Sequence, residues 1–497
     1  MNKIEQFKAE KDGLDVGADI ERFAREGWET IPEGDVQRLK WHGVFLRDPT
    51  PGHFMMRIRI TNGITSALQL RTIADISRRL GGAILDVTTR QQIQLRWLTI
   101  QSVPGIREAL EAVGLNTFQT GMDNIRNVVG CPVAGITREE LFDASPVARA
   151  FTAAFVGNRA FTNLPRKYNV TITACKENCT HAESQDIALT PAMKETAGEE
   201  VKGFNVAVGG KMGSGGYRIA SPLDAFTAPD EAVEVCCQIT AIYRDHGPRE
   251  ARNKSRLAFL MEEWGVEKFR LELERRLGRA LPGAGEDARL AKATDHLGIF
   301  REKTDGLNYV GLKTPVGRLT ADQLDEVARL SEAYGTGEVR LTPGQNLIIP
   351  HVPDRKVGDL TEEPLLKVLR YDPSEAMRGL VACTGTDFCN LALIDTKGHA
   401  MAIARHLEKR LPGLRPITVH WSGCPAGCGN HHVADIGFQG VKTKVDGEVV
   451  EAVNIFVGGK SGPAARLAEP IMQNVPVKEL PQVLETLLRY YPRQRKG

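Results

Sequence analysis

The chain has 497 residues, of which 42% are hydrophobic and 25% charged, as in ordinary soluble globular proteins. The 64 basic and 62 acidic residues leave a net charge of +2, which argues against a nucleic-acid partner. No apolar run approaches the roughly 18 residues of a membrane span, and residues 1–15 resemble neither a signal nor a transit peptide. We therefore expect a cytoplasmic protein without a membrane partner, with about three domains by length alone.

The first half of the chain alternates between strand and helix patterns. Residues 1–48 are predicted to be helical and irregular. The stretch MMRIRI from Met55 alternates as a strand does, and LDVTTRQQIQLRW predicts a strand, a turn and a strand. Between them lies a predicted helix with apolar positions at Leu68, Leu70, Ile73 and Ile76.

The same order returns in the second half. Residues 309–312 are strand-like, residues 323–330 are helical, and VRLTPGQNLIIP repeats the strand, turn and strand. Nearly constant offsets relate the halves, which predicts an internal duplication. Each half would hold a β-α-β unit and a larger α+β domain, joined by a linker at LPGAGED near residue 281. The paired residues are Gln69 and Gln323, Thr88 and Thr342, Gln91 and Gln345, Arg126 and Arg378, Cys131 and Cys383, Cys175 and Cys424, Cys179 and Cys428, and Asp186 and Asp435.

Four of the nine cysteines form the most informative pattern. CTGTDFC holds Cys383 and Cys389, and SGCPAGCGN holds Cys424 and Cys428. Four thiolates are the usual ligands of a [4Fe–4S] cluster, whereas structural zinc sites favour tighter C-x2-C spacings. Glycines beside the cysteines allow close backbone approach and N–H donation to sulfur. A cluster is therefore favoured over zinc and over buried free thiols.

The remaining cysteines have simpler interpretations. Cys131, Cys175 and Cys179 occupy three of the four matching positions in the first half, but Thr137 stands opposite Cys389. We interpret them as a relic of the duplication in preference to a second cluster. Cys236 and Cys237 fall in a helical pattern and are expected to be inert core thiols.

The motifs CTGTDFC and HWSGCPAGCGNHHVADIGFQG, with most of the chain around them, resemble the nitrite and sulfite reductase family. The resemblance implies an α+β, internally duplicated fold with two ferredoxin-like half-domains and two larger α+β domains. It also implies two cofactors, sirohaem and a [4Fe–4S] cluster bound by all four cysteines, with Cys428 bridging the cluster to the sirohaem iron. The expected segments are residues 1–48 (entry segment), 49–118 and 306–366 (half-domains), and 119–290 and 367–497 (large domains).

A small oxyanion and the sirohaem carboxylates both need fixed cations. Single arginines and lysines are usually solvated, so the resemblance carries these assignments. It assigns Arg90, Arg126 and Lys167 to the substrate and Arg166 to sirohaem. Further cofactor contacts are expected from RNKSR and TPGQN, with His431 and His432 given no ligand role. These further residues are Arg252, Lys254, Arg256, Gln345 and Asn346.

The strand LPRKYNV bears on substrate choice. Family members that reduce sulfite resemble Lys-x-Lys here, and those that reduce nitrite resemble Lys-x-Asn; this chain has Lys167 and Asn169. We therefore expect the six-electron reduction of nitrite to ammonia, with Asn169 at the substrate. The alternatives are a ferredoxin-dependent sulfite reductase, a relative in corrin biosynthesis and a zinc-binding scaffold.

The electron donor is expected to be external, because no dinucleotide fingerprint follows a strand. Reduced ferredoxin is the donor that the resemblance implies, with flavodoxin as an alternative, and the enzyme is expected to be a monomer. The basic stretches at residues 78–80 and 493–496 are candidate docking sites for an acidic donor.

Overall fold

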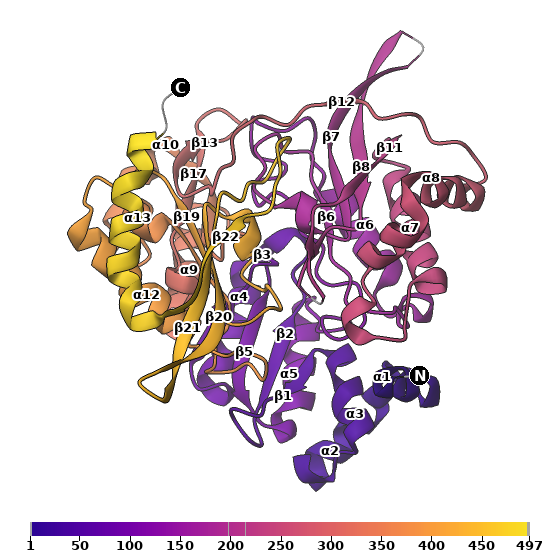
Figure 1. The fold of residues 1–497 in the computed structure, drawn as a ribbon, viewed down its shortest axis with the longest axis horizontal. Coiled ribbons are helices and arrows are strands. Elements are labelled where there is room, and N and C mark those ends of the chain that lie inside the picture. Colours follow the sequence, from indigo (N-terminus) through magenta and orange to yellow (C-terminus); the bar gives the residue numbers. More distant parts are fainter. Residues whose placement is uncertain (1, 197, 214, 495–497) are drawn as a thin grey trace.

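The computed structural model describes residues 2–196, 198–213 and 215–494. Within them, four five-stranded sheets and a two-stranded ribbon combine with helices, which confirms the α+β class (Figure 1). In the view of Figure 1, the two large domains lie on opposite sides, with β2, β3 and α4 between them. None of the described helices has the length and apolar character needed to cross a membrane.

The entry segment wraps the first sheet. Its helices are α1 (Lys3–Glu10), α2 (Ile20–Glu26) and α3 (Glu33–Arg38). Val16, Ile20 and Phe23 are buried in the same core as the half-domains. The segment ends in β1 (Val44–Leu46), which pairs antiparallel with β2 (Phe54–Ile58), so residues 1–48 also supply a strand to the first half-domain sheet.

The two half-domain sheets exchange their edge strands. The first sheet has the order β1-β2-β5-β4-β15, and the second has the order β13-β14-β17-β16-β3. β15 (Arg318–Thr320) therefore belongs to the second half of the sequence but pairs with β4, and β3 (Ile64–Ser66) pairs with β16. One continuous core lies under both sheets. The other strands are β4 (Ile84–Val87), β5 (Ile93–Leu98), β13 (Gly298–Arg301), β14 (Leu307–Leu312), β16 (Glu338–Leu341) and β17 (Leu347–Pro353).

Helices α4 (Ala67–Leu80) and α9 (Ala321–Tyr334) pack against each other and begin with the same signal. Ser66 with Gln69, and Thr320 with Gln323, form capping boxes that satisfy the first amides of each helix. The predicted apolar face of α4 is buried except at Leu68, whose side chain is 63% exposed because it lies off the i, i+3 stripe.

The basic stretch at residues 78–80 is balanced by nearby carboxylates. Arg78 contacts Asp322 and Asp325 on α9, and Arg79 contacts Asp75 one turn away. The docking prediction for this stretch therefore has little free positive charge to support it. Of the other stretch, residues 495 and 496 lie outside the described residues, as do the side chains of residues 493 and 494.

Two more helices, α5 (Val103–Ala112) and α10 (Asp354–Glu362), complete the half-domains.

The large domains repeat one plan. In the first, β6 pairs parallel with β7 and the sheet continues antiparallel; in the second, β19 pairs parallel with β20 before the same change. The first holds α6 (Ser145–Phe155), β6 (Val170–Ile172), β7 (Ile187–Thr196), β8 (Glu199–Val208), β9 (Lys211–Met212), β10 (Tyr217–Arg218), β11 (Ser221–Thr227), α7 (Ala232–His246), α8 (Leu257–Leu277) and β12 (Glu286–Asp287). The second holds α11 (Glu375–Arg378), β18 (Gly379–Ala382), α12 (Thr396–Arg410), β19 (Thr418–Ser422), β20 (Ile436–Val445), β21 (Glu448–Val457), β22 (Glu469–Pro476) and α13 (Leu480–Gln494).

His351 on β17 lies between two carboxylates of the second half-domain. Its Nδ1 lies 3.0 Å from Glu302 Oε2 and its Nε2 lies 3.6 Å from Glu338 Oε1. These contacts, with Glu302 the larger, raise the pKa of His351 to about 9. A pKa raised in the folded state stabilises the fold below the ordinary value near 6.5, and this stabilisation is lost as the pH rises through about 9.

We expect His351→Gln to lower the free energy of unfolding by about 1–2 kcal/mol at pH 6 and by much less at pH 10, allowing for partial solvent screening. Denaturant unfolding of both proteins at the two pH values measures the difference. His53→Gln is the control, because the ring of His53 bonds to the Pro51 carbonyl of its own loop and contacts the Trp97 ring, with no carboxylate partner among the described residues. An equal loss at both pH values would contradict the assignment.

Candidate functional site

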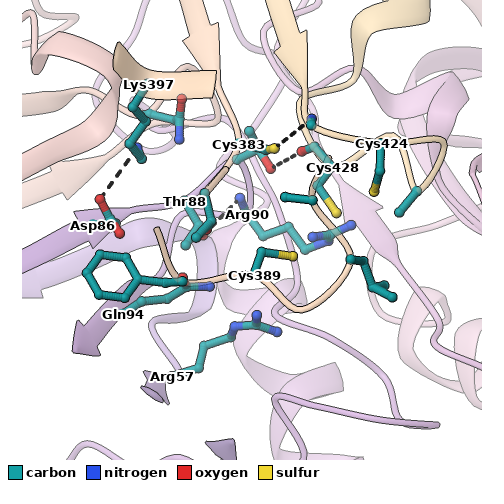
Figure 2. Close-up of a pocket in the computed structure, with 18 of the residues that line it drawn as sticks. Arg57, Asp86, Thr88, Arg90, Gln94, Cys383, Cys389, Lys397, Cys424 and Cys428 are labelled. Carbon is teal, nitrogen blue, oxygen red and sulfur yellow. Dashed lines mark hydrogen bonds and ion pairs between the residues drawn. The ribbon is translucent and has the colours of Figure 1, made fainter. Parts of the chain in front are cut away.

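Four cysteines from two loops line one cavity (Figure 2). Cys383 and Cys389 follow β18, and Cys424 and Cys428 follow β19. The two strands pair in parallel, with Ala382 opposite Trp421, so the loops leave the sheet at the same edge. The structure thus brings together the four cysteines predicted from the sequence, and Cys428 is the most exposed of the four.

Both halves of the chain hold these loops in place. The Gly423 amide donates to Cys383 Sγ over 3.1 Å, and the Thr89 hydroxyl donates to the Cys428 carbonyl over 3.1 Å. The Tyr217 hydroxyl donates to the Pro425 carbonyl over 3.0 Å. The Gly423 donor favours the thiolate of Cys383, which is the form that binds metal, but burial is the larger effect and raises the pKa of this thiol to about 12.

Gln345 holds the start of the loop that carries Cys383 and Cys389. Its amide nitrogen donates to the carbonyls of Ala382 (3.0 Å) and Val87 (3.2 Å), and its amide oxygen accepts from the Ala382 amide (3.0 Å). Gln91 makes the matching bonds to Gly130, directly before Cys131. Gln345 therefore fixes the residue before Cys383, whereas Asn346 lines a different cavity and bonds to the Thr314 amide.

The predicted substrate cations gather around Cys428. Cys428 opens to the cavity but is surrounded by protein, and this desolvation alone would raise the pKa of its thiol. Lys167, Arg90, Arg57 and Arg126 together lower that pKa below its ordinary value. Figure 2 shows Arg57 and Arg90 beside the four cysteines. The sequence placed these cations in separate segments, and the fold directs them to one thiol.

Lys167 has no ion-pair partner among the described residues, and burial together with Arg256 and Arg90 lowers its pKa well below the ordinary value. Its backbone position comes from the neighbouring Tyr168, whose amide donates to the Asn124 carbonyl (3.0 Å) and whose carbonyl accepts from the Arg126 amide (2.8 Å). Arg126 and Lys167 are thus carried by two paired extended segments that precede β6.

Asn169 fixes Arg90. Its side-chain oxygen accepts from Arg90 Nε over 3.1 Å, and its backbone amide donates to Asp186 Oδ2 over 2.8 Å. Asp186 in turn holds Arg256 in a fully buried bidentate pair at 3.0 and 2.6 Å. Arg256, predicted as a cofactor contact, therefore supports Asn169 through Asp186.

The other predicted cofactor cations differ in their surroundings. Asp123 is fully buried and binds Arg252 through both oxygens, and Arg166 lies 3.7 Å away from the same carboxylate. Arg252 is therefore neutralised by its partner, while Arg166 keeps a buried Nε without a hydrogen bond. Lys254 is exposed.

Arg47 and Arg57 are cavity cations that the sequence analysis missed. Both line the cavity, and burial lowers the pKa of Arg57 to about 9 and that of Arg47 to about 10. Arg57 sits within the strand pattern MMRIRI, where alternation alone gives no reason to single it out. A charged residue next to buried strand neighbours was the available signal.

The arginines around the cavity show whether the site suits sirohaem, which carries several carboxylates. Among the described residues, four arginines around this site have a buried Nε with no hydrogen-bond partner, at a cost that an anionic ligand would relieve. A polycarboxylate macrocycle supplies such acceptors, and the four thiols supply the ligands of a cluster. The residues present therefore fit both groups. The unpartnered atoms belong to Arg47, Arg57, Arg126 and Arg166.

The fold and the site define a duplicated α+β protein with four metal-binding thiols facing a pocket for an anion. Residues 121–281 and 374–497 match the nitrite and sulphite reductase 4Fe-4S domain, and residues 47–113 and 300–366 match the nitrite/sulfite reductase ferredoxin-like half domain. The chain belongs to the nitrite and sulphite reductase family.

Curated relatives match over nearly their full length. A ferredoxin–nitrite reductase of Synechococcus elongatus is 46% identical over 98% of this chain and 96% of its own. An assimilatory ferredoxin-dependent nitrite reductase of Haloferax mediterranei is 41% identical over 99% of this chain and 89% of its own. The solved structure of the Mycobacterium tuberculosis NirA protein superposes with a TM-score of 0.94 at 32% identity, covering 100% of this chain and 94% of that one. The predicted duplicated fold is confirmed.

Proposed function

We propose that this chain reduces nitrite to ammonia with electrons from reduced ferredoxin. The observation that carries the proposal is the convergence of Arg90, Arg126 and Lys167 on Cys428, within a family member that matches ferredoxin–nitrite reductases over almost its whole length. An anion entering this cavity meets fixed positive charge beside a metal-binding thiol.

Cys383, Cys389, Cys424 and Cys428 would hold the [4Fe–4S] cluster, and the Cys428 thiolate would also help to hold sirohaem. Arg47, Arg57 and Arg166 would bind the sirohaem carboxylates, because each has an unpartnered buried Nε. When bound, the two groups supply the one-electron transfers of the six-electron reduction.

The chain's own side chains bind and protonate the anion. Arg90, oriented by Asn169, presents its remaining N–H groups to a nitrite oxygen, and Arg126 adds charge. Lys167 has no ion-pair partner among the described residues and a lowered pKa, so its ammonium gives up a proton more readily than an exposed lysine. A nitrite oxygen leaves as water only after it has received two protons, and Lys167 would deliver one of them.

Ferredoxin is the donor that we infer, with flavodoxin as an alternative. We also infer that the protein is a monomer. We infer a cytoplasmic location because all nine cysteines are unpaired and cluster ligation requires reduced thiols.

The direct test is a comparison of two anions. Purified enzyme with reduced ferredoxin should convert nitrite to ammonium, with a specificity constant above that for sulfite. Visible spectra with each anion report binding separately from turnover. A higher constant for sulfite would replace the proposal with the sulfite reductase alternative.

Asn169 is the residue that we expect to favour nitrite. Asn169→Lys adds a cation beside the anion and removes the acceptor that orients Arg90, so both activities should fall. The dianionic form of sulfite gains more from the charge, so the ratio of sulfite to nitrite specificity constants should rise by roughly tenfold, or about 1–2 kcal/mol.

The ratio of specificity constants is measured for the parent enzyme and for Asn169→Lys. A small artificial reductant replaces ferredoxin, so that docking of the electron donor does not affect the result. Leu271→Lys is the control: it adds the same charge at an exposed position of α8. An unchanged ratio in a fully loaded Asn169→Lys enzyme would show that this position does not select the substrate.

A further inference from the structure

Three buried cysteines of the first half form a compact group away from the cluster cavity. The Sγ atoms of Cys131, Cys175 and Cys179 all lie within 4.8 Å of one another, and the side chains are 1%, 2% and 9% exposed. They are the counterparts of Cys383, Cys424 and Cys428. The described residues of the second half contain no trio as tight, which suits ligands spread over separate irons of a cluster.

A histidine from another segment lies beside Cys131. His296 is fully buried, and its Nε2 lies 3.9 Å from Cys131 Sγ. Its Nδ1 lies 3.2 Å from the Tyr309 hydroxyl on β14. If Nδ1–H donates to that oxygen, the Nε2 lone pair faces Cys131 Sγ, which is the arrangement of a metal-binding histidine held by a second hydrogen bond. His296 stands outside the group of ligand atoms that all lie within 4.8 Å of one another, so its ring would move toward Cys175 and Cys179 on binding an ion.

We propose that Cys131, Cys175, Cys179 and His296 bind a zinc ion. Three thiolates and one imidazole are a common structural zinc set. Tetrahedral zinc with bonds of about 2.3 Å to sulfur places its sulfur ligands about 3.8 Å apart, within reach of the observed spacing after small movements. The inference goes beyond nitrite reduction and does not depend on it.

The surroundings favour one ion over a second cluster. The position matching Cys389 is Thr137, so a cluster would lack a thiolate, whereas the imidazole approaches from a different direction. The Glu177 amide lies 3.4 Å from Cys175 Sγ, as N–H donors do around zinc thiolates. The Glu177 carboxylate is paired with Lys292 at 3.0 Å and does not compete as a ligand.

The ion would join two parts of the fold. Cys175 and Cys179 follow β6 of the first large domain, while His296 precedes β13 of the second half-domain. The connecting chain already runs along the cysteine loop, with Leu290 and Thr294 amides donating to the Lys176 and Glu177 carbonyls. A cavity of about 490 Å³, lined by Cys179 and His296, gives a route of entry. Zinc here would stabilise the junction between the halves.

The test is metal analysis of the holoenzyme, produced with zinc supplied and dialysed against a chelator. We expect about one zinc per chain beside the iron of the cofactors, and a zinc X-ray absorption spectrum with three sulfur neighbours and one nitrogen. Cys179→Ser and His296→Gln should lower the zinc content at least about tenfold without loss of iron. Cys237→Ser, on α7, is the control and should keep the zinc.

Three results would overturn the proposal. The first is holoenzyme without zinc, or with zinc that the site variants retain. The second is additional iron that disappears in Cys179→Ser, which would mean a second cluster. The third is a zinc spectrum without three sulfur neighbours; it needs no variant, so it decides the matter even if the substitutions prevent folding.

Discussion

Cys428→Ser is expected to lower nitrite reduction by more than about a hundredfold while the fold stays intact. Cys428 is the cluster-loop thiol on which four cations converge, and those charges lower its pKa against the effect of burial. Serine keeps the size of the side chain, but its hydroxyl is a poor ligand for iron because it stays protonated at neutral pH. If Cys428 serves both the cluster and sirohaem, as proposed above, its replacement would remove the coupling between them.

Two measurements separate this explanation from simple misfolding. Electron paramagnetic resonance should show that any cluster and sirohaem still bound are no longer coupled, and iron analysis should show how much of each remains. Cys237→Ser is the control, since this partly buried thiol on α7 lies outside the cavity. Coupled spectra like those of the parent enzyme in Cys428→Ser would refute the shared-ligand assignment.

The sequence revealed the duplication because local signals recur. Each half of the chain has a helix that begins with a capping box, at Ser66 and at Thr320. Each half also has a turn glutamine, Gln91 or Gln345, that bonds to the residue before a cysteine. The capping boxes act within three residues, so a single sequence displays them. The glutamines recur at matching positions, but their bonds reach residues 39 and 37 positions further along the chain, which the sequence alone does not show. The cysteine loops are local, like the capping boxes, and their spacing indicated metal binding before any contact was known.

Long-range pairing was beyond the sequence. The exchange of β3 and β15 between sheets depends on contacts across some 250 residues, and three-residue edge strands carry almost no pattern. The partners of arginines were hidden for the same reason. Arg252 and Arg256 looked free in RNKSR, but Asp123 and Asp186 neutralise them from distant segments.

The cations around the cavity show what the sequence could predict and what it could not. Arg57 was read only as part of a strand, yet its Nε is buried and unpartnered. Asn169 was expected at the substrate on the strength of its spacing from Lys167, and the structure adds that its oxygen holds Arg90. Charge balance in three dimensions decides which cations remain available for an anion.

Lys167→Gln is expected to lower the specificity constant for nitrite by about 10²–10⁴-fold, the range for loss of a general acid. Burial, Arg256 and Arg90 lower the pKa of the Lys167 ammonium well below its ordinary value. The protonated form is the active one, so the specificity constant should fall as the pH rises through this lowered pKa. That alkaline limb should disappear in Lys167→Gln.

Lys167→Arg separates charge from proton transfer. Arginine keeps a cation near the anion but does not give up a proton at working pH, so KM should recover more than kcat. Lys202→Gln, at an exposed position of β8, is the control for loss of one lysine. The pH profiles of all four enzymes, measured with the cofactors fully loaded, decide the role. If Lys167→Gln keeps the alkaline limb of the parent enzyme, the proton comes from another group and Lys167 serves only to attract the anion.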